Sequence, residues 1–170
     1  MSESTSSPSV SFERRLSLLK NLPSFETLSV EVLNHIAENL GVESFGQHGE
    51  VVHEGCFGDR MYLIESGVVV VTVEGATGPV ELGNLGEGEM FGEIALLNEG
   101  RQRSATVTTL CPMVALTLDI HHFQRLAALY PEVRLDLACA ADALMQTRLE
   151  ALMRAKTQKM DGLSKSELAF

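Results

Sequence analysis

The chain has 170 residues, of which 45% are hydrophobic and 5% aromatic, and it contains no tryptophan. This length suits one domain, or one domain with a helical extension, and the hydrophobic share is sufficient for a core. The 23 acidic residues outnumber the 13 basic ones, which gives a formal charge of −10, and no basic cluster is visible. A protein that binds a nucleic-acid backbone needs a basic face, and one that stacks single-stranded bases needs aromatic side chains. The composition therefore argues against nucleic acid as a partner.

The cysteines and the apolar runs bear on the compartment. Cys56, Cys111 and Cys139 are odd in number and lack CxxC spacing, which predicts free thiols without a disulfide framework or a zinc site. The N-terminus has no apolar stretch of the signal-peptide type, and the longest uncharged run, 104–118, is too short for a membrane span. These features predict a cytoplasmic chain without a membrane partner.

The N-terminal part is expected to be helical after a short tail. Residues 1–11 are rich in serine and threonine and are expected to be disordered. Two helices are predicted over residues 12–40. Pro23 ends the first, and Ser29 can cap the second. The second helix carries an apolar stripe. Its members are Val30, Leu33, Ile36, Ala37 and Leu40.

Residues 42–118 change to short hydrophobic runs separated by glycine-containing turns. Many short strands with glycine at their corners predict a small sandwich or barrel. The strand candidates are Val51–Val52, Met61–Ile64, Val68–Val73, Val80–Leu85, Ala105–Leu110 and Val114–Leu118.

Two further helices are predicted over residues 119–156. Asp119 can cap the first, and Pro131 suits the first turn of the second. The second helix carries two apolar stripes, which predicts two packing partners: the strand domain and something outside it. One stripe contains Leu137, Ala141 and Leu144 and reaches Arg148, and the other contains Leu135, Ala138, Met145, Leu149 and Leu152. Residues 157–170 are expected to form a flexible tail.

The most informative segment combines a glycine, a carboxylate and an arginine. It reads Phe91-Gly92-Glu93-Ile94-Ala95-Leu96-Leu97, a loop over 98–102, and Arg103-Ser104-Ala105-Thr106. Gly92 lets backbone N–H groups approach an anion, Arg103 can bind a phosphate with two prongs, and Glu93 suits a sugar hydroxyl. The pattern predicts a pocket for a small anion that carries hydroxyls. Two alternatives are a strand–turn–strand with a surface arginine and a structural ion pair between Glu93 and Arg103.

This segment resembles the phosphate-binding cassette of the cyclic nucleotide-binding domain family. The loop 98–102 is similar in length to that of the bacterial catabolite-activator type, and is one residue longer than in kinase-type members. Glu54-Gly55, Gly58-Asp59 and the strand 61–64 match further parts of the family pattern. Arg101 competes as the phosphate ligand, but the Ser-Ala-Thr after Arg103 favours Arg103. The resemblance covers about residues 16–150.

The resemblance implies a mainly β fold with flanking helices: an eight-stranded β-roll, a jelly-roll-like double-stranded β-helix, with N-terminal helices and a long C-terminal helix. The domain would span residues 12–156, with the β-roll over 42–118. Glu93 would accept the ribose 2′-hydroxyl, and Arg103 would neutralise the cyclic phosphate. Ser104 favours cAMP over cGMP as the ligand. The remaining cassette positions would complete the cradle: Phe91, Gly92, Ile94, Ala95, Ser104 and Ala105.

Thr147 and Arg148 are the candidates for contact with the base. Some relatives, especially channel-type ones, cover the purine with a basic residue of this helix, as Arg148 would do by a cation–π contact. Relatives of the catabolite-activator type use hydroxyl residues, which points to Thr147. An Arg148 that extends to solvent or pairs with a nearby acid is the competing interpretation.

The implied function is that of a regulatory cAMP sensor without a cofactor, which signals through its C-terminal helix to a second copy or to another protein. No catalytic arrangement stands out, so no enzyme activity is expected. Residues 157–170 are too few for the helix-turn-helix of catabolite-activator-like regulators, so DNA binding is not expected. A cGMP-responsive sensor and a ligand-free dimerisation or interaction module remain the alternatives.

Overall fold

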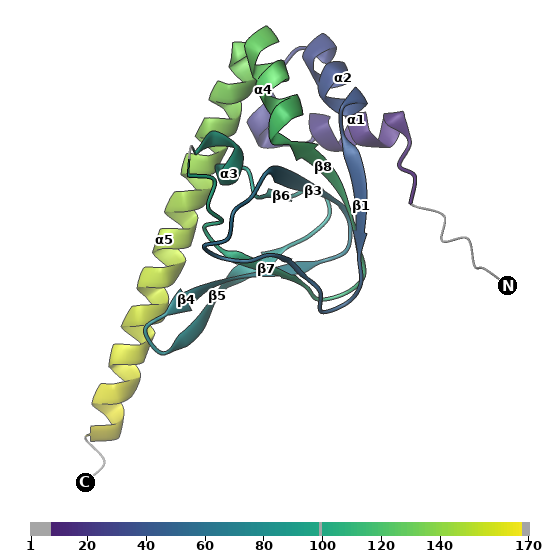
Figure 1. The fold of residues 1–170 in the computed structure, drawn as a ribbon. Helices are drawn as coiled ribbons and strands as arrows, with labels where there is room; N and C mark the ends of the chain where they lie inside the picture. Colours follow the sequence, from purple (N-terminus) through teal and green to yellow (C-terminus); the bar gives the residue numbers. More distant parts are fainter. Residues whose placement is uncertain (1–7, 99, 168–170) are drawn as a thin grey trace, which may run out of the picture.

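The computed structural model describes residues 8–98 and 100–167. Two antiparallel sheets of four strands form the centre, and helices pack at the end of the sheets where the chain enters and leaves them (Figure 1). The strand order is β1-β8-β3-β6 in one sheet and β2-β7-β4-β5 in the other. The sheets are not closed into a barrel, and the predicted eight-stranded β-roll with flanking helices is confirmed.

The strands have these bounds: β1 Gly41–Phe45, β2 Glu50–Val52, β3 Arg60–Ser66, β4 Val69–Gly75, β5 Gly78–Leu85, β6 Met90–Phe91, β7 Thr106–Thr109 and β8 Met113–Asp119. Two of them, β1 and β6, are absent from the strand candidates of the sequence. β1 pairs with β8 along its whole length, from Gly41 opposite Thr117 to Phe45 opposite Met113. β6 has only two residues, which pair with Tyr62 and Leu63 of β3. Pairing with a distant strand, rather than local pattern, defines both strands.

The N-terminal helices are α1 (Phe12–Lys20), the 3₁₀ turn η1 (Pro23–Phe25) and α2 (Val30–Glu38). Ser11 caps α1 by accepting from the N–H of Arg14 at 3.2 Å. Ser29 caps α2 by accepting from the N–H of Val32 at 3.3 Å, as predicted. Residues 1–7 of the expected tail lie outside the described residues.

The C-terminal part consists of α4 (Ile120–Leu129) and α5 (Pro131–Glu167). Asp119 caps α4 by accepting from the N–H of His122 at 2.9 Å, and α5 begins at Pro131, as predicted. α5 runs on past Lys156, so residues 157–167 are helical where a flexible tail was expected; residues 168–170 lie outside the described residues. The physical reason is that this stretch contains no proline, and its single glycine costs a helix only about 1 kcal/mol. Among the described residues, none of the helices has the length and apolar character that crossing a membrane requires.

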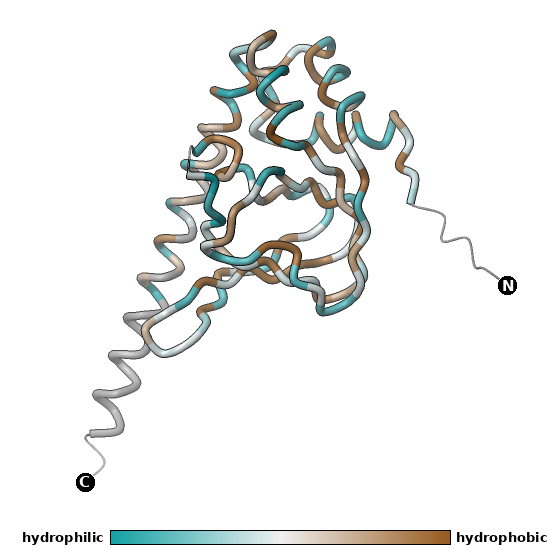
Figure 2. The backbone as a smooth tube through the Cα atoms, in the orientation of Figure 1, coloured by the Kyte–Doolittle hydropathy of each residue, from teal (hydrophilic) through white to brown (hydrophobic). Residues whose placement is uncertain are grey.

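Two hydrophobic cores hold these layers together. One lies between the two sheets and includes Val69, Val107 and Ala115. The other joins α1, α2, α4 and α5 to the sheet of β3 and β8, and includes Leu19, Leu116 and Phe123. Figure 2 shows hydrophobic segments both in the strands and in the helices above them. The helices thus sit on the strand domain, and α5 contacts η1, β5 and the short helix α3 (Ile94–Leu97).

Candidate ligand-binding site

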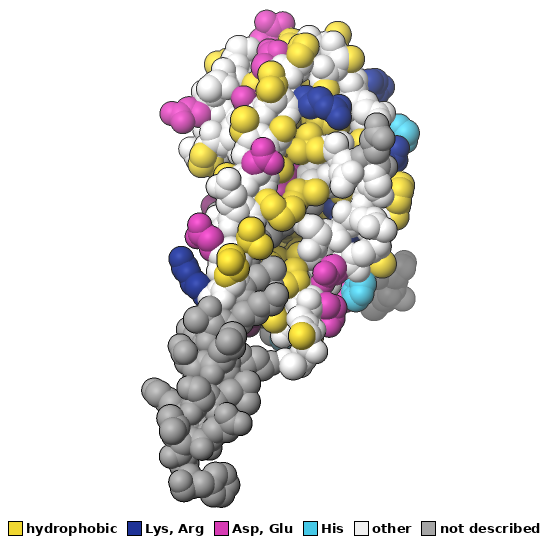
Figure 3. Space-filling view, turned by 90° about the vertical axis from the view of Figure 1, so that its left-hand side faces the viewer, with side chains coloured by type: hydrophobic (Ala, Val, Ile, Leu, Met, Phe, Trp, Pro, Cys, Tyr) yellow, Lys and Arg dark blue, Asp and Glu magenta, His cyan; other side chains and the backbone are white. Residues whose placement is uncertain are grey.

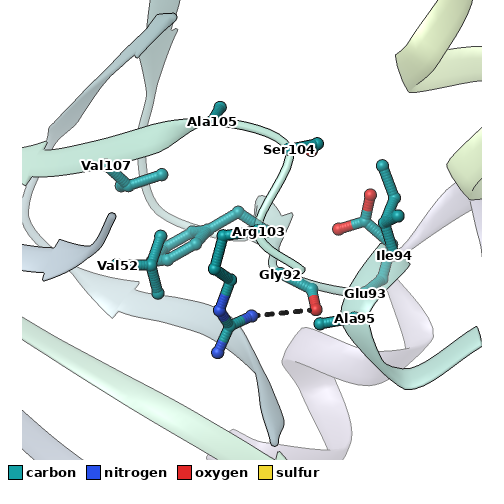
Figure 4. A pocket seen from close by; sticks show the side chains of 10 residues that line it. Val52, Gly92, Glu93, Ile94, Ala95, Arg103, Ser104, Ala105 and Val107 are labelled. Atoms are coloured by element: carbon teal, nitrogen blue, oxygen red, sulfur yellow. Dashed lines mark hydrogen bonds between the residues drawn. The ribbon is translucent and has the colours of Figure 1, made fainter. Parts of the chain in front are cut away.

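The predicted cassette residues surround one pocket with an empty volume of about 290 Å³ (Figure 4). The turn between β6 and α3 forms one wall, and the segment that enters β7 forms the other. Two valines of the second sheet complete it: Val107, at the end of the cassette segment, and Val52, which the sequence did not relate to the site. The lining residues are Val52, Phe91, Gly92, Glu93, Ile94, Ala95, Arg103, Ser104, Ala105 and Val107.

Arg103 is the central basic group of this pocket, and its side chain is almost completely buried. Its Nη1 donates hydrogen bonds to the carbonyl oxygen of Arg60 at 2.8 Å and to that of Gly92 at 3.2 Å, the second of which is drawn in Figure 4. Its guanidinium carbon lies 5.8 Å from the centre of the Tyr62 ring, which stacks on Phe91 with centroids 4.9 Å apart. Burial lowers the pKa of Arg103, whereas the charges of Asp59 and Glu93 act in the opposite direction. The guanidinium is therefore a fixed cation in a site that excludes much of the water.

Two glycines make room for this guanidinium. A Cβ atom at Gly92 would lie 2.6 Å from Nη1 of Arg103, and Gly92 has a φ of 83°, which disfavours other residues. A Cβ atom at Gly58 would lie 2.2 Å from Nε of Arg103. The sequence suggested the close approach at Gly92. Gly58 matches the family pattern together with Asp59, but nothing local in the sequence relates it to Arg103.

Only one of the two arginines of the loop enters the pocket, although the backbone of both is paired with the Gly55–Gly58 turn. The N–H of Arg103 donates to the carbonyl oxygen of Cys56 at 2.8 Å, and the N–H of Gly55 donates to that of Arg103 at 2.8 Å. Arg101 has a φ of 47°, and its guanidinium carbon lies 5.4 Å from the centre of the exposed Phe57 ring. Arg101 does not line the cassette pocket, and Arg103 does.

Glu93 is fully buried and lines the same pocket as Arg103. The ion pairs among the described residues do not include one between these two side chains. Arg103 instead makes its hydrogen bonds to carbonyl oxygens, and Glu93 acts on it through its charge. Glu93 and Arg103 therefore do not form the structural ion pair that the sequence left open as an alternative. A carboxylate at this wall supplies acceptor oxygens for a hydroxyl.

The structure does not bring Thr147, one of the two candidates on α5, into this pocket. Thr147 is exposed, and its hydroxyl donates to the carbonyl oxygen of Ala143 at 3.1 Å, one turn back along the helix. The side chain of Arg148 lies outside the described residues. A helix hydroxyl that bonds to its own backbone is common, so the sequence alone could not tell this from a ligand contact.

The histidines and cysteines form no metal site in the described part of the chain. No group of three or more histidine, cysteine, aspartate or glutamate side chains is placed there to hold a metal ion. His122 instead lies 2.7 Å from the Asp119 carboxylate, which caps α4. The three cysteines are free thiols, as expected.

Comparison with known proteins identifies the family. The family model "Cyclic nucleotide-binding domain" matches residues 42–130, and this chain therefore belongs to the cyclic nucleotide-binding domain family. It is 38% identical over 118 residues to cGMP-dependent protein kinase, isozyme 1, of Drosophila melanogaster, a match that covers 67% of this chain and 15% of that protein. It is 39% identical over 108 residues to the cAMP-dependent protein kinase regulatory subunit of Yarrowia lipolytica, covering 64% of this chain and 28% of that protein. The chain thus spans less than a third of these curated relatives.

Solved structures show the same fold in two kinds of regulator. The regulatory domain of Toxoplasma gondii PKA, crystallised with cAMP, is 28% identical with a TM-score of 0.69, covering 78% of this chain and 50% of that one. The Thermus thermophilus catabolite activator protein is 30% identical with a TM-score of 0.65, covering 84% of this chain and 63% of that one. The domain is thus similar to regulatory domains of both the kinase type and the catabolite-activator type.

Proposed function

We propose that this chain is a regulatory sensor domain that binds cAMP in the cassette pocket and passes the binding event to a partner through α5. The observation that carries the proposal is the pocket itself. It places the buried Arg103 guanidinium, the buried Glu93 carboxylate and a stretch of backbone around one small cavity. A ligand with one anionic group and neighbouring hydroxyls matches this set of donors and acceptors.

The phosphate of the ligand would bind to Arg103. The two carbonyl oxygens that accept from Nη1 hold the guanidinium in place before the ligand arrives, so little side-chain entropy is lost on binding. α3 has only four residues, so we attribute any amide contribution to individual N–H groups near Gly92 and not to a helix dipole. Charge-assisted hydrogen bonds of this kind contribute about 1.5–3 kcal/mol each.

The ribose would bind to Glu93, whose carboxylate accepts from the 2′-hydroxyl. A site built to hydrogen-bond a hydroxyl discriminates strongly against analogues that lack it, because the buried acceptor then loses its partner. We therefore expect 2′-deoxy analogues to bind much more weakly than the ribonucleotide.

The choice of cAMP rests on Ser104. Ser104 is half-buried at the pocket wall, where a threonine would favour cGMP by resemblance to the family. The relatives include both a cAMP-dependent and a cGMP-dependent kinase protein at nearly equal identity, so identity alone does not favour either nucleotide. The preference must be decided by measuring the affinities for cAMP and cGMP side by side.

α5 is suited to carry the signal because it contacts both the cassette and the N-terminal helices. It touches α3 directly, and its Asp136 accepts a hydrogen bond of 2.6 Å from Thr27, beyond η1. One side of α5 is buried against the domain, while hydrophobic side chains on another side are exposed, as Figure 3 shows for the face that carries α5. The exposed ones are Leu135, Met145, Leu149 and Met153. We propose that this face, named here the outer stripe, binds a second copy of the chain or another protein.

Titration calorimetry with cAMP and cGMP tests the ligand. We expect the wild type to bind cAMP more tightly than cGMP, and Arg103→Ala to lose about a hundred-fold or more in affinity, because two charge-assisted hydrogen bonds disappear. Arg101→Ala is the matched control, since it removes an arginine of the same loop that does not line the pocket. Absence of any binding by the wild type would favour the ligand-free interaction module, and unchanged binding by Arg103→Ala would exclude the proposed site.

Light scattering tests the outer stripe separately. We expect the wild type to be a dimer and Leu149→Glu to be a monomer, because a charge replaces an exposed apolar contact. Glu150→Gln, on a neighbouring exposed position, is the control that should keep the dimer. A monomeric wild type would mean that the outer stripe serves a different protein.

A further inference from the structure

A second acidic group lies close to the ligand-binding arginine. Asp59 and Arg103 both line another pocket, and Asp59 directly follows Gly58, which lies against the guanidinium of Arg103. The charge of Asp59 acts on Arg103, and that of Arg103 acts on Asp59. Nη1 of Arg103 is occupied by two carbonyl oxygens, so a ligand anion and Asp59 would compete for its remaining donors.

Asp59 is held by a different arginine. Arg60 donates from Nε to Oδ1 of Asp59 at 2.9 Å and from Nη2 to Oδ2 at 3.3 Å, which engages both carboxylate oxygens. This hydrogen bonding lowers the pKa of Asp59. Arg60 also donates from Nη1 to Oε1 of Glu43 on β1, which lies on the other side of β8 in the same sheet. Arg60 is therefore fixed from two sides, and Asp59 is turned toward it.

We propose that Arg60 is a positioning residue: its side chain holds the Asp59 carboxylate and thereby leaves the free donors of Arg103 to the anion of the ligand. The inference rests on the proposed function of the cassette pocket. A carboxylate tethered in the same pocket acts at an effective concentration in about the millimolar range, so without Arg60 it would compete with a dilute ligand. The carbonyl oxygen of Arg60 also orients Arg103, but a side-chain substitution leaves that contact in place.

The side-chain role predicts a specific pattern of rescue. We expect Arg60→Gln to weaken cAMP binding by about five-fold or more. A factor of about five in an equilibrium constant is what a favourable exposed ion pair can contribute. Adding Asp59→Asn should restore most of the affinity, because the competitor is removed. Adding Glu43→Gln should not, although it removes the same charge, since Glu43 lines neither pocket that contains Arg103.

Calorimetry on these four proteins, with urea unfolding to confirm that each is folded, tests the inference. Unchanged affinity in Arg60→Gln would overturn it, and equal rescue by the two second substitutions would reduce it to a general effect of charge. Arg60→Lys serves if the glutamine variant is unstable, and it should show a smaller loss because lysine cannot engage both oxygens of Asp59.

A crystal structure of ligand-free Arg60→Gln gives a readout that does not depend on nucleotide binding. We expect the Asp59 carboxylate to hydrogen-bond to Arg103 in that structure. If the wild type binds no cyclic nucleotide, the proposed function fails. The structure of Arg60→Gln still shows whether Asp59 hydrogen-bonds to Arg103 once the side chain of Arg60 is gone. An Asp59 that stays turned away from Arg103 overturns the inference in either case.

Discussion

Replacing Gly58 with alanine is a direct test of where Arg103 must lie. The added Cβ atom would stand 2.2 Å from Nε, 2.4 Å from Cζ and 2.8 Å from Nη2 of Arg103. Gly58 does not have a left-handed φ, so the backbone accepts alanine without strain and the collision with the guanidinium is the whole perturbation. Nε must withdraw by about 1.2 Å to reach ordinary contact at 3.4 Å.

That displacement affects both stability and affinity. Overpacking of this kind costs about 1–3 kcal/mol of folding free energy. The hydrogen bonds from Nη1 to the carbonyl oxygens of Arg60 and Gly92, now 2.8 Å and 3.2 Å long, would be lost or misaligned. A guanidinium moved by this much no longer aligns with the ligand anion, and the loss of one charge-assisted hydrogen bond, about 1.5–3 kcal/mol, corresponds to about a ten- to hundred-fold loss of affinity.

Calorimetry with cAMP and urea unfolding measure the two effects. Gly46→Ala is the matched control, because a Cβ atom at Gly46 has no neighbour within 4 Å and Gly46 has no left-handed φ. We expect the control to match the wild type in both assays, and Gly58→Ala to show a lower unfolding midpoint together with weaker binding. Wild-type affinity in a folded Gly58→Ala protein would refute the reasoning, since it would mean that the position of Arg103 does not control the ligand.

Three further predictions concern other parts of the domain. Glu93→Ala, which removes both side-chain acceptor oxygens, should weaken cAMP binding but abolish the difference in affinity between cAMP and 2′-deoxy-cAMP, and a difference that persists would remove Glu93 from the ribose site. Phe123→Ala should lower the free energy of unfolding by about 3–5 kcal/mol in urea titration, because the ring is fully buried where α4 meets the sheet. Burial alone would raise the pKa of Asp119, but hydrogen bonds from the N–H and ring of His122 lower it overall. Asp119 therefore stabilises the fold above its ordinary pKa of about 3.9 and stops doing so as the pH falls through the lowered value. The stability difference between wild type and Asp119→Ala, about 1 kcal/mol at neutral pH, should shrink below about pH 4, and a constant difference would contradict this.

Much of the fold was predictable because its signals are local. Caps such as Ser29 and Asp119 act within three residues of their partners, and both were identified correctly. The strands missed in the pattern are those without a local signal: β6 has two residues, and β1 has an exposed or half-buried face throughout. α5 continues into the stretch that was expected to be a flexible tail, because residues 157–167 contain no proline to end the helix.

In the candidate site, too, the residues with a local sequence signal were predictable and those that depend on distant contacts were not. The segment from Phe91 to Thr106 was found from its residue types, and the pocket is lined by those residues. Val52 and Gly58 were not assigned to it, because their contacts come from segments about fifty residues away along the chain. Thr147 was a candidate from its place on the helix, yet its hydroxyl donates to its own helix instead.

The sequence by itself determined which groups are available: a cassette with one carboxylate, one candidate arginine and the glycines that let backbone approach them. Only the tertiary structure decided how these groups are oriented. The Gly55–Gly58 turn pairs with the loop before β7, Arg103 enters the pocket there, and Arg60 engages the Asp59 carboxylate beside it. The physical reason is that residue types and local spacing carry the chemistry, whereas the direction of a charged side chain depends on partners that folding brings together from distant strands.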